Sequence, residues 1–278
     1  MAVTIRGKTL PLPILQGGMG VGISLDGLAG AVAACGGMGT LSTAVCGFQE
    51  PDFAKRPFEA NLRALDRQVR HAKVLAHGAG LIAVNAMVAT TQYADSVRTA
   101  LRAGADAIVC GAGLPKDLPA LASEVSDSDA AIAPFRDKVK IGTKFGFGVE
   151  ERQPTALNSR PGHIRRAVEA GAQFATRFIA TAECDASEGY KQRLLAAKVD
   201  DITLVKSPVG MPGRALRSPL IQRVEAGTQP PPERCVKCIT TCDGKNAPYC
   251  ISRALIAARN GDWENGLFFC GTNAGEIN

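Results

Sequence analysis

The feature that most constrains the fold is the alternation of short apolar runs with helical patterns in the first half of the chain. The runs do not alternate apolar and polar residues, which is typical of strands buried on both faces of a sheet. Strand–helix units that repeat every ~25–35 residues predict a parallel sheet, either closed or doubly wound. The runs lie at 14–16, 39–43, 81–87 and 107–110, and the helical patterns lie at 26–35, 58–76 and 93–103.

Length and composition fit a globular enzyme. The chain has 278 residues, 46% of them hydrophobic and 21% charged, and an α/β barrel of roughly 250 residues needs only one domain. The net charge of +6 is spread along the chain without interleaved aromatic residues, so nucleic acid is not expected as a partner. No apolar run reaches the length of a membrane span, and the N-terminus has no signal-peptide pattern. These features predict a cytoplasmic protein without a membrane partner.

A glycine-rich turn follows the first apolar run. The segment 16–22 reads Gln-Gly-Gly-Met-Gly-Val-Gly. Without side chains at these positions, the backbone is able to turn sharply and to approach a flat or phosphorylated ligand closely. The glycines do not have the G-x-G-x-x-G spacing of a dinucleotide-binding turn. The turn alone leaves two interpretations open, a ligand cradle and a tight bend without a ligand.

The rest of the chain departs from regular alternation. Apolar stretches at 130–134 and 139–142 leave no room between them for a crossover helix, so we expect six or seven strands instead of eight. The pattern predicts a further strand over 173–179, and helices over 161–170, 189–197, 219–225 and 251–260.

Several stretches together resemble the nitronate monooxygenase (2-nitropropane dioxygenase-like) family of FMN-dependent TIM barrels. The resemblance covers roughly four-fifths of the chain, and its motifs are specific only in combination. The matching stretches are 16–24, 36–40, 84–88, 106–115, 176–185, 205–214 and 266–274. The implied fold is an α/β (β/α)8 TIM barrel, incomplete in the strands that this chain shows, with a C-terminal helical cap that contains cysteines. We expect the barrel over 1–215 and the cap over 216–278.

The resemblance also implies a cofactor and its binding residues. The cofactor is FMN, and the glycine turn with Gly17, Gly18 and Met19 lies against the flavin ring. Asn85, at the end of the third strand, hydrogen-bonds the cofactor. The backbone at Gln173, Phe174, Ala175 and Thr176 corresponds to the family turn that holds the phosphate. Backbone N–H groups at a turn suit that role, because they bind anions.

Three departures from the family pattern fall in the middle of the chain. The family histidine that serves as base is replaced by Lys144 in the best-matching stretch, 142–147, and lysine is a poor base at neutral pH unless its pKa is lowered. The phosphate turn of the seventh family strand has no counterpart in 151–161. The helix that the family carries after residue 134 is also absent. Two interpretations stay open. Either the protein is a shortened relative of the family, or residues are missing from the given chain. A further family segment that has no counterpart would follow Ala172.

Other residue clusters have weaker claims to chemistry. Four cysteines occur at 235, 238, 242 and 250, and only the first pair has familiar metal-ligand spacing. We therefore predict no metal site and interpret them as free or redox-labile thiols. His71 and His77 are expected on the surface, and His163 is a candidate replacement base. Lys206 and Arg214 are candidates for anion binding or for a structural clamp of their loop. Glu183 and Asp185 are candidates for a charge cluster at the start of a helix.

The function expected from these features is that of an FMN-dependent oxidoreductase that oxidises alkyl nitronates or similar carbanions with O2. Its expected partners are a small-molecule substrate and O2. The sequence leaves open whether the protein forms a homodimer. One alternative is an NAD(P)H-dependent enoyl reductase, which shares this barrel. The other is a non-catalytic flavin-binding barrel that has lost the histidine base.

Overall fold

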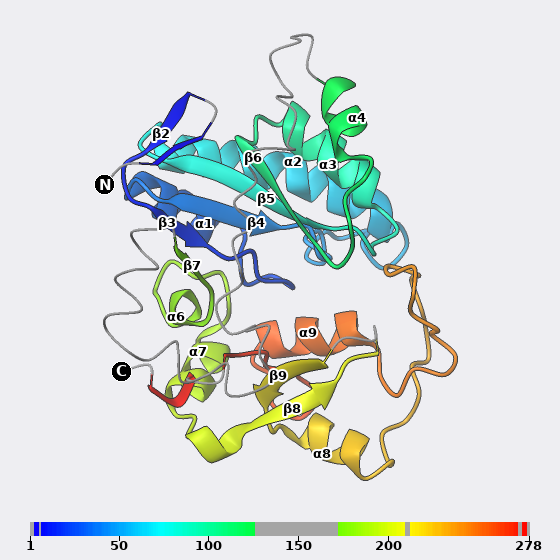
Figure 1. The fold of residues 1–278 in the computed structure, drawn as a ribbon. Coiled ribbons are helices and arrows are strands. Elements are labelled where there is room, and N and C mark those ends of the chain that lie inside the picture. Colours follow the sequence, from blue (N-terminus) through cyan, green and yellow to red (C-terminus); the bar gives the residue numbers. More distant parts are fainter. Residues whose placement is uncertain (1–2, 6, 126–171, 209–211, 272–273, 277–278) are drawn as a thin grey trace.

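A curled parallel sheet forms one layer of the protein (Figure 1). The computed structural model describes all residues except 1–2, 6, 126–171, 209–211, 272–273 and 277–278. The five strands run in the order β6-β5-β4-β3-β7. Their bounds are β3 Ile14–Gln16, β4 Met38–Ser42, β5 Leu81–Met87, β6 Ala107–Gly111 and β7 Ala172–Phe174.

The pairing of β7 is the clearest sign of barrel topology. β7 comes last of these strands in the chain, yet it pairs in parallel with β3, the first, with Leu15 opposite Gln173. A β/α barrel closes by joining its last strand to its first in this way. The α/β class is thus confirmed, with the described strands forming a half-barrel.

Helices from the upper half of Figure 1 cover the outer face of this sheet. Small residues bring them close: a Cβ added to Gly39 of β4 would lie 1.8 Å from the carbonyl oxygen of Ala29. Ala29, Leu41 and Val69 are all buried in the resulting core. The helices are α1 Asp26–Ala34, α2 Pro57–Ala76, α3 Tyr93–Arg102 and α4 Leu118–Ser123.

The amino ends of the strands are closed by an antiparallel hairpin that the sequence did not predict. Its strands are β1 Val3–Ile5 and β2 Lys8–Leu10. Leu10 is fully buried against Met38 and Leu81. With this end sealed, the carboxyl ends of the strands are the end available to a ligand.

A second layer packs below the sheet (Figure 1). Its core joins Val205 and Ala215 of an antiparallel hairpin to Tyr249 and Leu267. The division at residue 215 stays a prediction. The elements are α6 Thr176–Ile179, α7 Glu188–Leu195, β8 Ile202–Lys206, β9 Pro212–Leu216, α8 Pro219–Glu225 and α9 Ile251–Arg259, with 3-10 turns at Val199–Asp201 and Ala274–Glu276.

The strand predicted over 173–179 is partly wrong. The strand ends at Phe174, and a short helix begins at Thr176. Helical winding lets Ile179 reach the buried cluster that contains Tyr190 and Phe268. Burial of that side chain overrides the strand preference of β-branched residues, which is a weak and context-dependent preference.

One long segment connects the two layers. Residues 227–250, called the strap below, leave α8 and return at α9 without a helix or strand of their own. The strap rises along one side of the molecule (Figure 1). An isolated bridge pairs its Ile239 with Thr90 of the upper layer, and Thr240 N–H donates to the carbonyl of Ala89 at 2.9 Å. Within the described part of the chain, no helix is long and apolar enough to cross a membrane.

Candidate active site

A cavity of about 300 Å³ lies between the two layers, at the carboxyl ends of the strands. In a parallel α/β barrel this is the end where ligands bind. Four upper segments and the lower layer contribute to its walls. The upper contributions are Gly18, Gly20 and Val21 after β3, Ser42 to Val45 at the end of β4, Asn85 and Met87 of β5, and Gly111 with Ala112 at the end of β6.

The glycine turn is fixed from below by two buried side chains. Gln16 is fully buried; its Nε2 donates to Oγ of Ser24 at 2.9 Å, and its Oε1 accepts from Thr40 N–H at 2.8 Å. Ser24 Oγ also accepts from the N–H of Met19 at 3.0 Å. The sequence had suggested the glycines but not these two residues, which set the position of the loop on its strand. A polar Gln and Ser bracketing a glycine run was the available signal.

Gly18 and Asn85 meet at the cavity wall. Asn85 Nδ2 donates to the carbonyl of Gly18 at 3.2 Å. Met19, by contrast, packs against the cluster that contains Tyr190 and Phe268 in the lower layer. Gly18 and Asn85 are therefore the predicted site residues that the structure brings together on the cavity.

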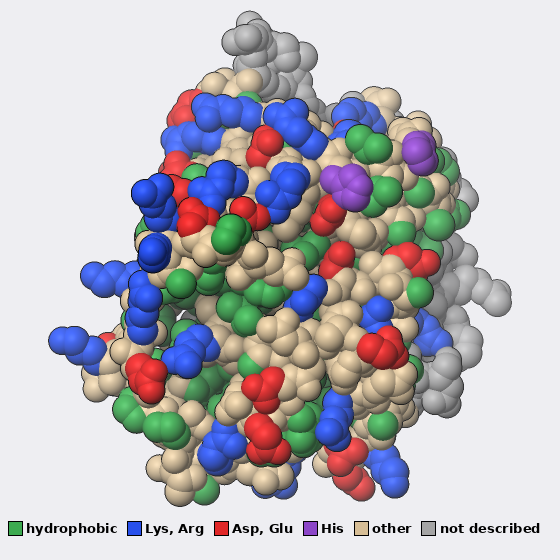
Figure 2. All heavy atoms as spheres, turned by 180° about the vertical axis from the view of Figure 1, so that it is seen from behind, with side chains coloured by type: hydrophobic (Ala, Val, Ile, Leu, Met, Phe, Trp, Pro, Cys, Tyr) green, Lys and Arg blue, Asp and Glu red, His purple; other side chains and the backbone are tan. Residues whose placement is uncertain are grey.

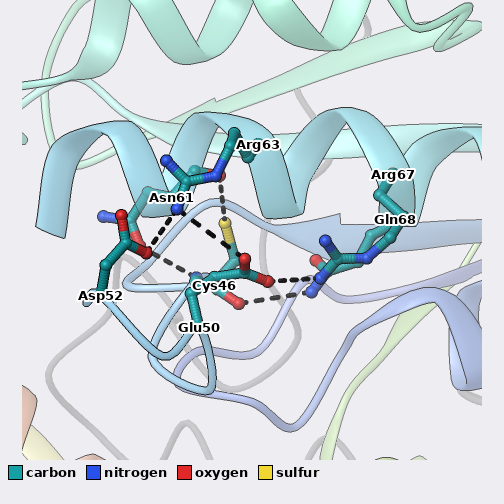
Figure 3. Close-up of polar contacts among 8 residues, drawn as sticks. Cys46, Glu50, Asp52, Asn61, Arg63, Arg67 and Gln68 are labelled. Carbon is teal, nitrogen blue, oxygen red and sulfur yellow. Dashed lines mark hydrogen bonds and ion pairs between the residues drawn. The ribbon is translucent and has the colours of Figure 1, made fainter. Parts of the chain in front are cut away.

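The loop after β4 forms a second wall and is held by α2 (Figure 3). Asn61 of α2 lines the cavity, and its Oδ1 accepts from Gly47 N–H at 2.9 Å. Gln68 Nε2 donates to the carbonyl of Cys46 at 3.3 Å. Figure 3 shows Arg63 and Arg67 reaching down to the carboxylates of this loop. Burial raises the pKa of the Cys46 thiol to about 12, so this thiol stays protonated and has a packing role.

The Asn61 side chain continues into a second amide. Its Nδ2 donates to Oε1 of Gln92 at 3.0 Å, and Gln92 Nε2 donates to the carbonyl of Phe58 at 2.9 Å. Both amides line the cavity. They offer a neutral polar surface whose orientation is set by the backbone at both ends, and no pattern in the sequence marks this pair.

The strap and α9 supply the wall from the lower layer. Cys238 and Ile239 of the strap line the cavity together with Ser252 of α9. Cys238 Sγ lies 3.2 Å from Ser252 Oγ. Burial raises the pKa of Cys238, and the contact with Ser252 lowers it by less. The thiol is therefore protonated at neutral pH.

Backbone strain accompanies the cavity. Three of the four non-glycine residues with positive φ among those described lie on the cavity segments: Val45 at 53°, Ala112 at 54° and Lys237 at 51°. Val45 and Ala112 line the cavity, and Lys237 precedes the lining residue Cys238. Such strain costs of order 1–3 kcal/mol per residue and is concentrated at functional sites. It supports the assignment of a ligand to this cavity.

The residues predicted to hold a phosphate lie on the neighbouring strand end. Because β7 pairs with β3, the turn at Ala175 and Thr176 follows the carboxyl end of β7 beside the glycine turn. Thr176 Oγ1 accepts from the N–H of Gly271 at 2.9 Å. Gly17, Met19 and residues 173–176 are not among the cavity-lining residues. Lys144 and His163 lie outside the described residues.

The described lining is uncharged. It contains no Asp, Glu, His, Lys or Arg, and Cys238 is its one titratable side chain. Glycine backbone, three side-chain amides and apolar side chains surround the space. A flat heterocycle with carbonyl and N–H edges fits such a lining, since glycines admit a ring closely and amides match its polar edge. The residues present therefore fit a flavin ring.

The remaining candidates are not among the lining residues, although Lys206 and Arg214 adjoin the lining residues Ser207 and Gly213 in sequence. His71 and His77 are exposed, as expected, and His71 pairs with Asp26. Asp185 accepts from the N–H groups of Leu25 and Leu28 at 2.9 and 3.2 Å, so it caps the start of α1. Of the two acids expected at a helix start, Asp185 thus lies at the start of α1, a helix distant in sequence. Among the described residues, no group of three or more potential ligands is arranged to hold a metal ion.

Fold and cavity together define a β/α half-barrel with a ligand site at the carboxyl ends of its strands. The family model for nitronate monooxygenase matches residues 5–135 and 166–278. The chain belongs to the nitronate monooxygenase family. It is accordingly a flavin-dependent oxidoreductase, and its cofactor is FMN. The unmatched residues 136–165 coincide with the stretch in which the sequence departs from the family pattern.

Two solved structures illustrate how this chain compares with known proteins. It is similar to FabK from Thermotoga maritima, with 20% identity, 96% of this chain and 88% of that chain covered, and a TM-score of 0.46. It is also similar to nitroalkane oxidase from Streptomyces ansochromogenes, with 19% identity, coverage of 97% and 92%, and a TM-score of 0.45. A search of the curated proteins found no match.

Proposed function

We propose that this flavin-dependent oxidoreductase oxidises preformed carbanions, alkyl nitronates being the test case, with O2 as the second substrate. The observation that carries the proposal is the match to the nitronate monooxygenase family, together with a described lining of backbone, amide, hydroxyl, thiol and apolar groups that suits an already deprotonated substrate. A substrate that needs a proton removed requires a positioned base. A nitronate has already lost that proton, so it needs only binding and orientation.

Each wall of the cavity has a separate part in this proposal. The glycine turn would support the ring of FMN through Gly18, with Gly17 and Met19 flanking it outside the described lining, and Asn85 would present its amide to the polar edge of the ring. The turn at Gln173 to Thr176, next to the glycine turn but outside the described lining, would bind the phosphate. When bound, FMN would supply the redox chemistry for electron transfer from the carbanion to O2.

The remaining lining binds the substrate. The amides of Asn61 and Gln92 donate to the oxygens of the nitronate, while Val45 and Ile239 contact its alkyl chain. These apolar contacts exclude water, which strengthens the polar interactions within the cavity.

The experiment compares protonation states of one substrate. Full-length protein with saturating FMN is supplied with a nitronate or with the corresponding neutral nitroalkane, and O2 consumption is measured. We expect turnover of the nitronate and at least a hundredfold slower turnover of the nitroalkane, because general base catalysis contributes about 10²–10⁴-fold. Equal rates would show that a base operates.

Lys144 is the candidate for such a base. Lys144→Met should leave nitronate oxidation unchanged and remove the residual nitroalkane oxidation if this lysine abstracts the proton. Oxidation of NAD(P)H by the loaded protein, without a response to nitronate, would instead favour the enoyl-reductase alternative. FMN binding without either reaction would favour a non-catalytic barrel.

The assembly and location of the protein are further proposals from the sequence. The composition and the N-terminal pattern favour a cytoplasmic enzyme. Measurement of the molecular mass in solution distinguishes a monomer from a homodimer.

A further inference from the structure

Six basic side chains lie on the two segments that wall one side of the cavity and on the helix start beside them. None has an ion-pair partner among the residues that the structure describes, although Arg234 donates to the carbonyl of Ala54 at 2.7 Å. All are exposed. This group, called the basic rim, consists of Lys55, Arg56, Arg234, Lys237, Lys245 and Arg253.

The rim is contiguous with the cavity. Lys237 directly precedes the lining residue Cys238 in sequence, and Arg253 directly follows the lining residue Ser252. The hydrogen bond from Arg234 to the carbonyl of Ala54 joins the strap to the loop after β4. Lys55, the next residue of that loop, therefore lies on the same side of the cavity as the strap. Figure 2, turned by 180° from Figure 1, shows Lys and Arg side chains gathered along the edge where the strap lies.

Neighbouring acids do not cancel this charge. Glu50 and Asp52 of the same loop are already paired with Arg67 and Arg63. The carboxylates left without an ion pair on these segments and at the start of α2 are Glu59, Glu233 and Asp243. Six unpaired cations thus stand against three unpaired carboxylates beside a cavity whose described lining is uncharged. A positive rim around an uncharged, low-dielectric site focuses the field on the entrance and raises the local concentration of anions.

We propose that the basic rim attracts the anionic substrate to the cavity and thereby selects the nitronate over its neutral conjugate acid. This inference rests on the proposed function. It assigns to Lys55, Arg56 and Lys237 a role in encounter, not in chemistry. The expected sign is specific: capture of an anion becomes slower when rim charge is removed or salt is added, whereas capture of a neutral molecule does not.

The main test uses two double variants with the same net charge. Lys55→Gln/Lys237→Gln removes two rim charges. Arg102→Gln/Lys198→Gln removes two exposed, unpaired charges from the C-terminal end of α3 and from the lower layer, away from the cavity. At low ionic strength we expect kcat/KM for a nitronate to fall about three- to tenfold in the rim variant and to change less than 1.5-fold in the control variant. In about 0.5 M salt the two variants should converge with the wild type.

A second measurement does not require turnover. Iodide is an anionic quencher of flavin fluorescence and acrylamide is a neutral one. In the FMN-loaded protein, the ratio of the iodide to the acrylamide quenching constant should fall at least twofold in the rim variant and stay constant in the control variant. An unchanged ratio together with equal kcat/KM values in the two variants would overturn the proposal. Absence of nitronate turnover in the wild type, with the quenching ratio shifted, would instead reject the proposed function and retain the positive rim.

Discussion

A Cβ atom added to Gly18 would lie 2.5 Å from the Cβ of Asn85, which is closer than packed carbon atoms approach. The pair closes one wall of the cavity, so neither residue is free to move outward. Gly18→Ala should therefore lower the free energy of unfolding by about 2–3 kcal/mol, the usual cost of forcing an atom into a packed site. It should also weaken FMN binding, because the loop that faces the ring must shift.

Gly111→Ala is the matched control for this substitution. Gly111 also lies at the cavity, but a Cβ added there would meet no atom within 4 Å. Its free energy of unfolding, measured by urea denaturation of the apo-protein, should change by less than about 1 kcal/mol. If the two variants were equally stable, the contact between Gly18 and Asn85 would not constrain the loop.

The amide of Asn85 provides a second prediction. Asn85→Leu keeps an approximately similar volume but removes the donor to Gly18 and the polar group proposed to meet FMN. Loss of one hydrogen bond of about 1–1.5 kcal/mol should raise the Kd for FMN roughly tenfold. Titration of FMN fluorescence measures this. Asn260→Leu, an exposed asparagine at the end of α9, is the control and should bind FMN as the wild type does.

Much of the sheet could be predicted from the sequence because its strands are buried on both faces. The strands at Ile14–Gln16 and Leu81–Met87 have the predicted bounds, and the helices over 219–225 and 251–259 agree within one residue. Such runs carry their own signal, since every residue in them except Gln16 and Asn85 is apolar. The N-terminal hairpin was missed because strands of three residues are too short to show a period.

The candidate site could be predicted only where the sequence marks the backbone. Gly18 and Asn85 stand in recognisable motifs, whereas Asn61, Gln92 and Cys238 reach the cavity through tertiary packing alone. An amide in a helix carries no local sign of what it faces. The segment that holds Lys144 lies outside the described residues, so the base assigned by resemblance stays a prediction.

The environment of the Asp106 carboxylate predicts how the stability of the fold depends on pH. Its side chain is only 2% exposed, contacts Lys8 and accepts from Lys73 Nζ and Ile82 N–H. Burial by itself would raise the pKa of Asp106, but these hydrogen bonds outweigh burial and hold the pKa below its usual range. A carboxylate with a lowered folded-state pKa stabilises the fold above its unfolded-state pKa of about 3.9, and the contribution is lost as pH falls through the folded-state value.

Asp106→Asn should therefore cost about 2–3 kcal/mol at pH 7, the range of charge-assisted hydrogen bonds to a buried group. The difference from the wild type should be constant above about pH 5 and shrink below about pH 4. Urea unfolding at a series of pH values measures both. Asp66→Asn, at an exposed ion pair with Arg70, is the control and should cost less than about 1 kcal/mol at pH 7. A constant difference for Asp106→Asn across the pH series would contradict the assignment.

The environment of Asp185 predicts a pH dependence of stability opposite in sign to that of Asp106. Burial raises the pKa of Asp185 above its usual range, although hydrogen bonds from Leu25 and Leu28 partly offset the shift. A raised folded-state pKa gives a contribution that is present below the unfolded-state value and lost as pH rises through the folded-state value. Asp185→Asn keeps an acceptor for the N–H groups of α1 without a buried charge. It should be at least as stable as the wild type at pH 7, with its relative advantage disappearing below about pH 4.

Asp185→Ala separates the cap from the charge. This variant removes the acceptor and leaves the start of α1 uncapped, so it should lose about 1–2 kcal/mol at pH 7. Equal loss in the Asn and Ala variants would show that the charge itself, interacting with the helix dipole, is the stabilising factor.

Ala112 tests whether the cavity stores backbone strain. Its φ of 54° is one that glycine adopts freely and that costs an L-residue roughly 1–2 kcal/mol. Ala112→Gly relieves this cost, while the added freedom of the unfolded chain takes back about 0.4–1 kcal/mol. We expect the unfolding free energy of the apo-protein to rise slightly, by up to about 1 kcal/mol.

Ala120→Gly, at an exposed position within α4, should instead lose about 1 kcal/mol, because glycine weakens a helix interior. The sign of the difference decides the question: if Ala112→Gly destabilises as much as Ala120→Gly, Ala112 is not strained. If strain also holds the cavity open for FMN, the more stable Ala112→Gly variant should bind FMN more weakly, which titration on the same preparation measures.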